Sequence, residues 1–180
     1  AQRLVNEAAE RNGYTEDSGY QGTSAFNGSA PSDEGYYSSR EEKLQAWENG
    51  DYEGSASLED FRDGIDINNL EFVAFDNRSY RSADEMRKEA IRNIRETLNS
   101  GAKEITMYRS VPAGISENSF RNGDWITPSR EYAIENARVH GDYPGWENGY
   151  RIIEQKVPTS AVWWDGNDIA EWGYDDGRRS

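Results

Sequence analysis

The sequence predicts an α+β fold, because segments with helical periodicity and segments with strand periodicity follow one another in its second half. Residues 83–98 place apolar side chains on one helical face, residues 104–111 have the alternation of a β-strand, and residues 150–157 are also typical of a strand. The chain has 180 residues, which suits one domain. We expect residues 1–80 to form a helical, loop-rich extension and residues 81–180 to form the core, packed together as one domain.

The first 80 residues contain only short predicted elements. The apolar spacing of residues 2–12 predicts a short amphipathic helix that Gly13 ends. Residues 14–60 are rich in Gly, Ser, Asp, Glu and Tyr, and we expect loops there. Within that stretch, residues 39–47 and 58–61 are predicted to form short helices, neither of which carries obvious chemistry.

The helix over residues 83–98 has clear start and stop signals. Ser82 and Glu85 have the spacing of a capping box, and Gly101 supplies the stop. The apolar positions on one face are Ala83, Met86, Ala90, Ile94 and Leu98. In the strand that follows, Arg109 falls on the same side as Ile105 and Met107, so an arginine shares an apolar strand face.

The remaining segments predict a strand, a capped helix and two further strands. Residues 123–127 form the strand, and Ser129 is the N-cap of a helix that runs to about His140. The positions of this helix that face inward are Ala133, Ile134 and Ala137. Residues 150–157 and 161–164 are the further strands, and residues 165–174 form a loop that leads into an aromatic segment.

Composition narrows the classes of function. A net charge of −14 and a pI of about 4.5 would repel a phosphate backbone, so we do not expect non-specific nucleic-acid binding. The absence of cysteine removes thiolate chemistry, and we expect no metal. No apolar run approaches the roughly 20 residues that span a bilayer, and no signal peptide is recognisable. We expect a soluble protein, cytoplasmic or delivered into a target cell, and a fragment of a longer polypeptide, because the chain begins with Ala1.

Several polar residues have a structural explanation when each is taken alone. Arg109 suits an ion pair at a strand end, Ser129 suits an N-cap, and Glu171 suits a solvated surface carboxylate. His140, the only histidine, suits a helix C-terminus, and no Gly-x-Ser-x-Gly sequence accompanies it to support a catalytic triad.

Three segments in a fixed order change this interpretation. They are Tyr108-Arg109-Ser110-Val111-Pro112, residues 123–129 (GDWITPS) and residues 165–174 (DGNDIAEWGY). Over residues 104–176 the chain resembles the arginine-serine-glutamate class of mono-ADP-ribosyltransferases, particularly modules of bacterial and phage toxin-like proteins. The resemblance implies an ADP-ribosyltransferase-like catalytic core, with two small, mostly antiparallel sheets around an NAD cleft and helices on the flanks.

The resemblance also implies roles for individual residues. Breaking the bond between nicotinamide and ribose creates an oxocarbenium-like cation, which the carboxylate of Glu171 would stabilise from the ribose 2′-hydroxyl. Arg109 would hold a diphosphate or ribose oxygen through its planar fork. Thr127 takes the position of the hydroxyl that orients the glutamate, and Ser129 lies two residues on, although Pro128 departs from the usual Ser-Thr-Ser.

Other residues are expected to line the NAD and acceptor sides of the site. Tyr108 and Ser110 flank the arginine, and either Tyr132 or Trp125 would stack on nicotinamide. On the acceptor side, family members that modify arginine carry Glu or Gln where this chain has Ile169. That departure argues against arginine as the acceptor. Asp168 either reaches the acceptor or is an Asx-type turn residue.

Three functions from different classes follow. The first is mono-ADP-ribosyl transfer from NAD, as substrate, to a macromolecule, protein rather than nucleic acid, with NAD glycohydrolase activity at the same site and an immunity protein as a further partner. The second is a glycoside hydrolase with paired carboxylates such as Asp165 and Glu171, which the six tryptophans fit but the motif order does not. The third is a non-catalytic interaction module of a phage or toxin polypeptide.

Overall fold

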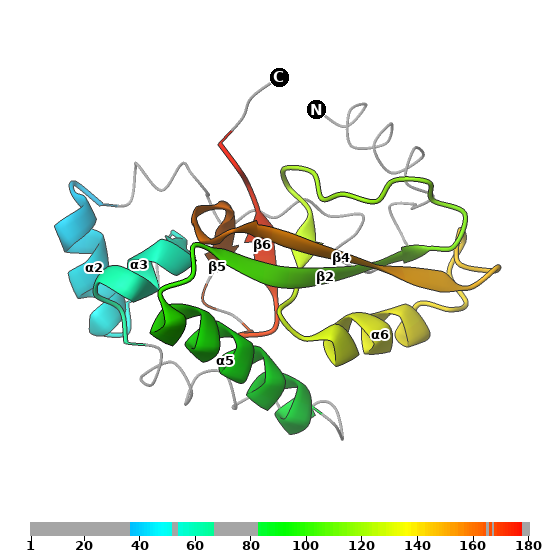
Figure 1. Ribbon diagram of the computed structural model, residues 1–180, viewed down its shortest axis with the longest axis horizontal. Helices are drawn as coiled ribbons and strands as arrows, with labels where there is room; N and C mark the ends of the chain where they lie inside the picture. Colours follow the sequence, from blue (N-terminus) through cyan, green and yellow to red (C-terminus); the bar gives the residue numbers. More distant parts are fainter. Residues whose placement is uncertain (1–36, 52–53, 67–82, 165, 167, 178–180) are drawn as a thin grey trace.

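The computed structural model describes residues 37–51, 54–66, 83–164, 166 and 168–177 (Figure 1). The helix predicted over residues 2–12, the capping residue Ser82 and the carboxylate of Asp165 lie outside the described residues. Within them the chain has the predicted α+β architecture, with two small antiparallel sheets and helices beside them.

Two antiparallel sheets form the framework. One has four strands in the order β1-β5-β6-β3, and the other pairs β2 with β4. The strands are β1 (Ala56–Ser57), β2 (Glu104–Pro112), β3 (Trp125–Ile126), β4 (Tyr150–Pro158), β5 (Val162–Trp164) and β6 (Trp172–Tyr174). β2 and β4 pair along their whole length, from Glu104 opposite Pro158 to Pro112 opposite Tyr150. This pair corresponds to the strands predicted over residues 104–111 and 150–157.

The helices of the described residues lie close to the predicted ranges. They are α2 (Arg40–Glu48), α3 (Leu58–Asp63), α5 (Ala83–Ser100), α6 (Arg130–Val139) and the short 3-10 turn η1 (Thr159–Ala161). The Ser39 hydroxyl accepts the amide of Glu42 (3.1 Å) at the start of α2. Gly101, with φ +72°, ends α5, and its amide donates to the Leu98 carbonyl. None of these helices is both long and apolar enough to cross a membrane.

Four large aromatic side chains form the centre of the core. They are Trp47 on α2, Phe61 on α3, Trp164 on β5 and Trp172 on β6. The ring centroids of Trp47 and Trp164 are 5.8 Å apart, and those of Trp164 and Trp172 are 6.0 Å apart. Such contacts between large rings stabilise the core beyond the area that they bury, and aliphatic side chains such as Leu58, Ile94 and Ile126 pack around them. Residues 37–66 therefore pack into the same hydrophobic core as the C-terminal half.

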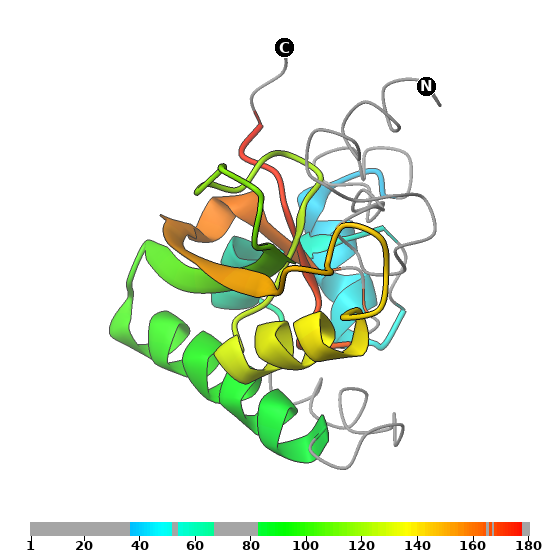
Figure 2. The same ribbon diagram turned by 90° about the vertical axis from the view of Figure 1, so that its right-hand side faces the viewer.

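Helices α5 and α6 lie along the same side of the β2–β4 pair (Figures 1 and 2). The predicted core positions Met86, Ala90 and Ile94 of α5 are buried. In α6, Ala133 and Ala137 are buried, but Ile134 is partly exposed, which corrects its predicted inward position. Each helical residue turns by about 100° from the one before it, so Ile134 lies at the edge of the stripe that contains the two alanines.

β3 is shorter than the strand predicted over residues 123–127. The residues before it form a turn, in which the amide of Asp124 donates to the Arg121 carbonyl (3.0 Å) and Gly123 has a φ of +95°. After β3, Thr127 continues the pairing only through a single bridge to Tyr108 on β2. The edge of the four-stranded sheet thus meets the two-stranded sheet at this point.

Candidate functional site

The first two predicted motifs meet where β2 passes the end of β3. The Tyr108 amide donates to the Thr127 carbonyl (2.8 Å), and the Thr127 amide donates to the Tyr108 carbonyl (2.9 Å). Arg109 follows Tyr108 on β2, and Ser129 lies two residues after Thr127. The bridge therefore fixes the backbone of the Tyr-Arg pair against the segment Thr-Pro-Ser.

Thr127 and Ser129 shape the connection from β3 into α6, and both side chains are buried. Oγ1 of Thr127 accepts the amide of Ser129 (3.1 Å). Oγ of Ser129 accepts the amide of Tyr132 (3.1 Å), which confirms the predicted N-cap. The same hydroxyl donates to the carboxylate of Glu89 on α5 (3.0 Å). Ser129 is therefore held from both sides, by its own helix and by α5.

Glu171, which is partly buried, lies in the loop just before β6. Its carboxylate accepts a hydrogen bond from the hydroxyl of Tyr132, a residue in the first turn of α6. The resemblance implied that Thr127 would orient this glutamate. In the structure the hydroxyl of Thr127 is turned to the Ser129 amide, and Tyr132 is the residue whose hydroxyl holds Glu171.

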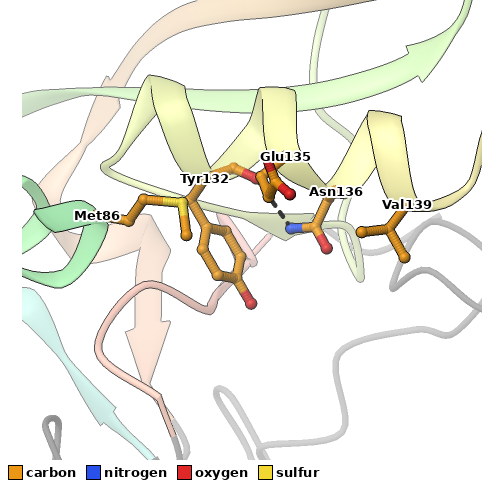
Figure 3. A pocket seen from close by; sticks show the side chains of 5 residues that line it. All are labelled: Met86, Tyr132, Glu135, Asn136 and Val139. Atoms are coloured by element: carbon orange, nitrogen blue, oxygen red, sulfur yellow. Dashed lines mark hydrogen bonds between the residues drawn. The ribbon is translucent and has the colours of Figure 1, made fainter. Parts of the chain in front are cut away.

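A shallow hollow opens beside Tyr132 (Figure 3). It encloses about 240 Å³, its open mouth included, and is lined by Met86 of α5 and by Tyr132, Glu135, Asn136 and Val139 of α6. The side-chain amide of Asn136 donates to the Tyr132 carbonyl (3.2 Å). Because the Tyr132 ring lines the hollow and its hydroxyl reaches Glu171, this surface lies next to the carboxylate.

Arg109 is only 2% exposed, on the apolar side of β2 as predicted. Its Nη1 donates to the Trp125 carbonyl (2.8 Å), and its Nε lies 3.8 Å from Oδ2 of Asp124. That carboxylate also accepts the amide of Arg121 (2.9 Å). The guanidinium thus ties β2 to the turn before β3, which is the structural ion-pair role, and its contact with NAD stays a prediction.

The other predicted site residues have varied surroundings. Ser110 is fully buried and Trp125 is partly exposed on β3. Ile169 is fully buried within the hydrophobic core, so its side chain does not face an acceptor in this arrangement. Asp168 accepts the amide of Ala170 (3.0 Å), which is the contact expected of an Asx-type turn residue.

His140 has the helix-terminal position predicted for it. It is the C-cap of α6, and its Nδ1 lies 2.6 Å from the Asn136 carbonyl oxygen. Its ring packs against Tyr143 and Trp146, with centroids 5.0 and 6.2 Å away. These contacts give the histidine a packing role at the end of the helix.

Polar side chains of α5 also belong to the site, although the sequence prediction omitted them. Oε1 of Glu89 accepts the amide of Arg130 (3.2 Å), while Oε2 accepts the hydroxyl of Ser129 (3.0 Å). The side-chain amide of Asn93 donates to the Pro128 carbonyl (2.6 Å). A carboxylate at the N-terminus of α6 is also favoured by the helix dipole. Helix α5 therefore holds the whole turn that leads into α6.

Arg87 is a third residue of α5 that the prediction omitted, and here the sequence contains a signal. It stands four residues before Ile91 and seven before Ile94, within the buried stripe of the helix. Its guanidinium pairs with Asp168 (2.9 Å). A charged residue at an apolar position is the same anomaly that drew attention to Arg109.

The phenol of Tyr108 is expected to have a raised pKa. Burial raises its pKa above the ordinary value of 10.0, as do the negative charges of Glu154 and Glu89, while Arg130 lowers it. Above pH 10.0 the unfolded chain therefore loses this proton first, so stability that is complete below pH 10.0 is lost as the pH rises through the folded-state pKa. In an absorbance titration, Tyr108→Phe should remove an ionisation above pH 10.0; loss of a step at or below that pH would contradict this.

Comparisons with known proteins identify no relative. No family model, no curated protein and no solved structure matches the chain. Among the residues that the structure describes, no group of three His, Asp or Glu side chains is arranged to hold a metal ion. Its function must therefore be inferred from the residues and contacts of the site.

Proposed function

We propose that the chain is a mono-ADP-ribosyltransferase, which cleaves NAD and transfers ADP-ribose to a macromolecule. The bond between the nicotinamide nitrogen and ribose C1′ breaks, and its electron pair leaves with neutral nicotinamide. A nucleophilic group of the acceptor forms a new bond to C1′ and loses its proton. With water as the nucleophile, the same site hydrolyses NAD to ADP-ribose.

The observation that carries the proposal is a continuous series of hydrogen bonds through the three motifs. Tyr108 pairs with Thr127 through the backbone, and Thr127 accepts the amide of Ser129. Ser129 accepts the amide of Tyr132, whose hydroxyl donates to Glu171. Motifs that are far apart in the sequence are therefore neighbours around the start of α6, as a shared site requires.

Glu171 has the surroundings that its proposed role needs. A carboxylate beside the sugar stabilises the developing cation more strongly than it stabilises uncharged NAD, so it lowers the barrier. A hydroxyl that donates to a carboxylate fixes the orientation of the carboxylate. In this chain Tyr132 supplies that hydroxyl, so it takes the task that the resemblance gave to Thr127.

Protein is the acceptor class that we propose. The chain carries a net charge of −14, which attracts basic protein surfaces and repels nucleic acid. Ile169 stands where arginine-modifying members of the family have a polar side chain, and it is buried in the core. The acceptor must therefore be engaged by other residues near Glu171.

The test is transfer of labelled ADP-ribose from NAD to proteins of a cell lysate. The wild-type chain should label protein, and Glu171→Gln should not. Glu104→Gln is the matched control, because Glu104 is an exposed glutamate at the far end of β2 and the change removes the same charge. Nicotinamide release without labelled protein would identify an NAD glycohydrolase, and labelling that persists in Glu171→Gln would refute the assignment.

Replacement of Tyr132 by phenylalanine should reduce turnover while the fold is kept. The change removes only the hydroxyl that donates to Glu171, and a hydrogen bond to a charged group is worth about 1.5–3 kcal/mol, or roughly tenfold to a hundredfold in rate. Steady-state kinetics of nicotinamide release would measure the loss. A kcat equal to that of the wild type would show that the hydroxyl does not orient the glutamate.

A further inference from the structure

Arg87 reaches from α5 to the loop that carries Glu171. The arginine is 3% exposed, and its Nη2 lies 2.9 Å from Oδ2 of Asp168, while its Nε lies 3.4 Å from Oδ1. The side chain of Asp168 is itself only 14% exposed. Two parallel contacts between a guanidinium and a carboxylate fix direction as well as distance, and little water screens this pair.

Asp168 in turn organises the backbone up to Glu171. Its carboxylate accepts the amide of Ala170 (3.0 Å), and its carbonyl accepts both the amide of Glu171 (2.8 Å) and the indole N–H of Trp164 (2.8 Å). Asp168, which pairs with Arg87, is therefore also the residue whose carbonyl binds the backbone amide of Glu171. A shift of Asp168 would move the glutamate with it.

Helix α5, which carries Arg87, also binds the segment that leads into α6. Glu89 and Asn93 bind the segment Pro128-Ser129-Arg130 at the start of α6. Tyr132, which donates to Glu171, is in the first turn of that helix. Because α5 binds both the loop of Asp168 and the start of α6, it sets the separation between the Tyr132 hydroxyl and the Glu171 carboxylate.

We propose that Arg87 is a positioning residue for Glu171, acting through Asp168. The inference rests on the proposed function for its effect on turnover, whereas its effect on the loop stands on the contacts alone. A misplacement of a reacting group by about 1 Å costs on the order of 100-fold in rate, so loss of the ion pair between Arg87 and Asp168 should lower kcat strongly. Because Arg87 itself does not bind NAD in this account, the KM for NAD should stay close to the wild-type value.

The test compares Arg87→Ala with Lys43→Ala, a matched control. Lys43 is a buried cation on α2, and its Nζ lies 3.0 Å from Oδ2 of Asp60, so its loss breaks a similar buried ion pair away from the proposed site. Two quantities are measured for each variant: kcat and KM for nicotinamide release, and hydrogen exchange of the Glu171 amide. Arg87→Lys, which keeps a positive charge opposite Asp168, serves as the rescue variant.

Arg87→Ala should lower kcat by on the order of 100-fold and speed exchange at the Glu171 amide, while Lys43→Ala should change neither. Arg87→Lys should recover part of both. Equal kcat and equal protection of the Glu171 amide in the Arg87→Ala and Lys43→Ala variants would overturn the proposal. A wild-type chain that releases no nicotinamide would refute the proposed function only, because amide exchange still decides whether Arg87 positions the loop.

Discussion

Glu171→Gln is expected to lower the kcat of NAD cleavage by about two to three orders of magnitude while NAD binding is largely kept. The amide has nearly the size of the carboxylate and retains an oxygen that accepts the Tyr132 hydroxyl, so the loop should keep its place. It lacks the negative charge that stabilises the cation at ribose C1′. Loss of one preorganised electrostatic contact of this kind costs on the order of 10²–10³-fold in kcat. Steady-state kinetics and calorimetric titration with NAD measure the two quantities separately.

The changes in kcat and in the dissociation constant for NAD together distinguish the possible roles of Glu171. A fall in kcat with little change in the dissociation constant indicates a contact that is made mainly in the transition state. A weaker affinity with unchanged kcat would instead mean that Glu171 binds NAD equally before and during reaction. Activity equal to that of the wild type would remove Glu171 from the mechanism.

Arg109→Ala is expected to lower the free energy of unfolding by about 3 kcal/mol, because it removes a buried cation and leaves its partners behind. The Trp125 carbonyl loses its guanidinium donor, and the partly buried carboxylate of Asp124 loses a nearby positive charge. Arg138→Ala is the matched control. Its side chain is 66% exposed and pairs with Glu135 at 3.6 Å, so its loss should cost less than about 1 kcal/mol.

Arg109→Ala should also weaken NAD binding, and Arg109→Lys shows which part of the arginine matters. Lysine keeps the charge but lacks the planar fork that bonds to a diphosphate or ribose oxygen. Calorimetric titration at a temperature where circular dichroism shows each variant to be folded separates binding from stability. An unchanged dissociation constant in both variants would leave Arg109 with a structural role alone.

The elements with strong local signals were predictable from the sequence. Gly101 ends α5, Ser129 caps α6, and the alternation of residues 104–111 gives β2, because caps and periodicity act within a few residues. β3 was predicted too long, since its length depends on pairing with β6, which no local pattern contains. The burial of α2 and α3 against Trp164 likewise depends on contacts across the whole chain.

The proposed site was predictable at its motifs but not at the contacts between them. The order of the motifs named Arg109, Ser129 and Glu171, and the apolar strand face around Arg109 was visible in advance. The hydroxyl that holds Glu171 could not be assigned, because it depends on how α6 packs beside the loop before β6. The role of Arg87 is not predictable from its place in an apolar stripe alone, because its partner Asp168 is distant in the sequence.

NAD cleavage is tested most directly by nicotinamide release from NAD by the purified wild-type chain, measured over hours beside Glu171→Gln, with and without cell lysate. If the chain cleaves NAD as proposed, the wild type should release nicotinamide, faster with lysate, and Glu171→Gln should release it roughly 100-fold or more slowly. No release by the wild-type chain, together with no NAD binding by calorimetry, would contradict the proposed cleavage and favour a non-catalytic interaction module.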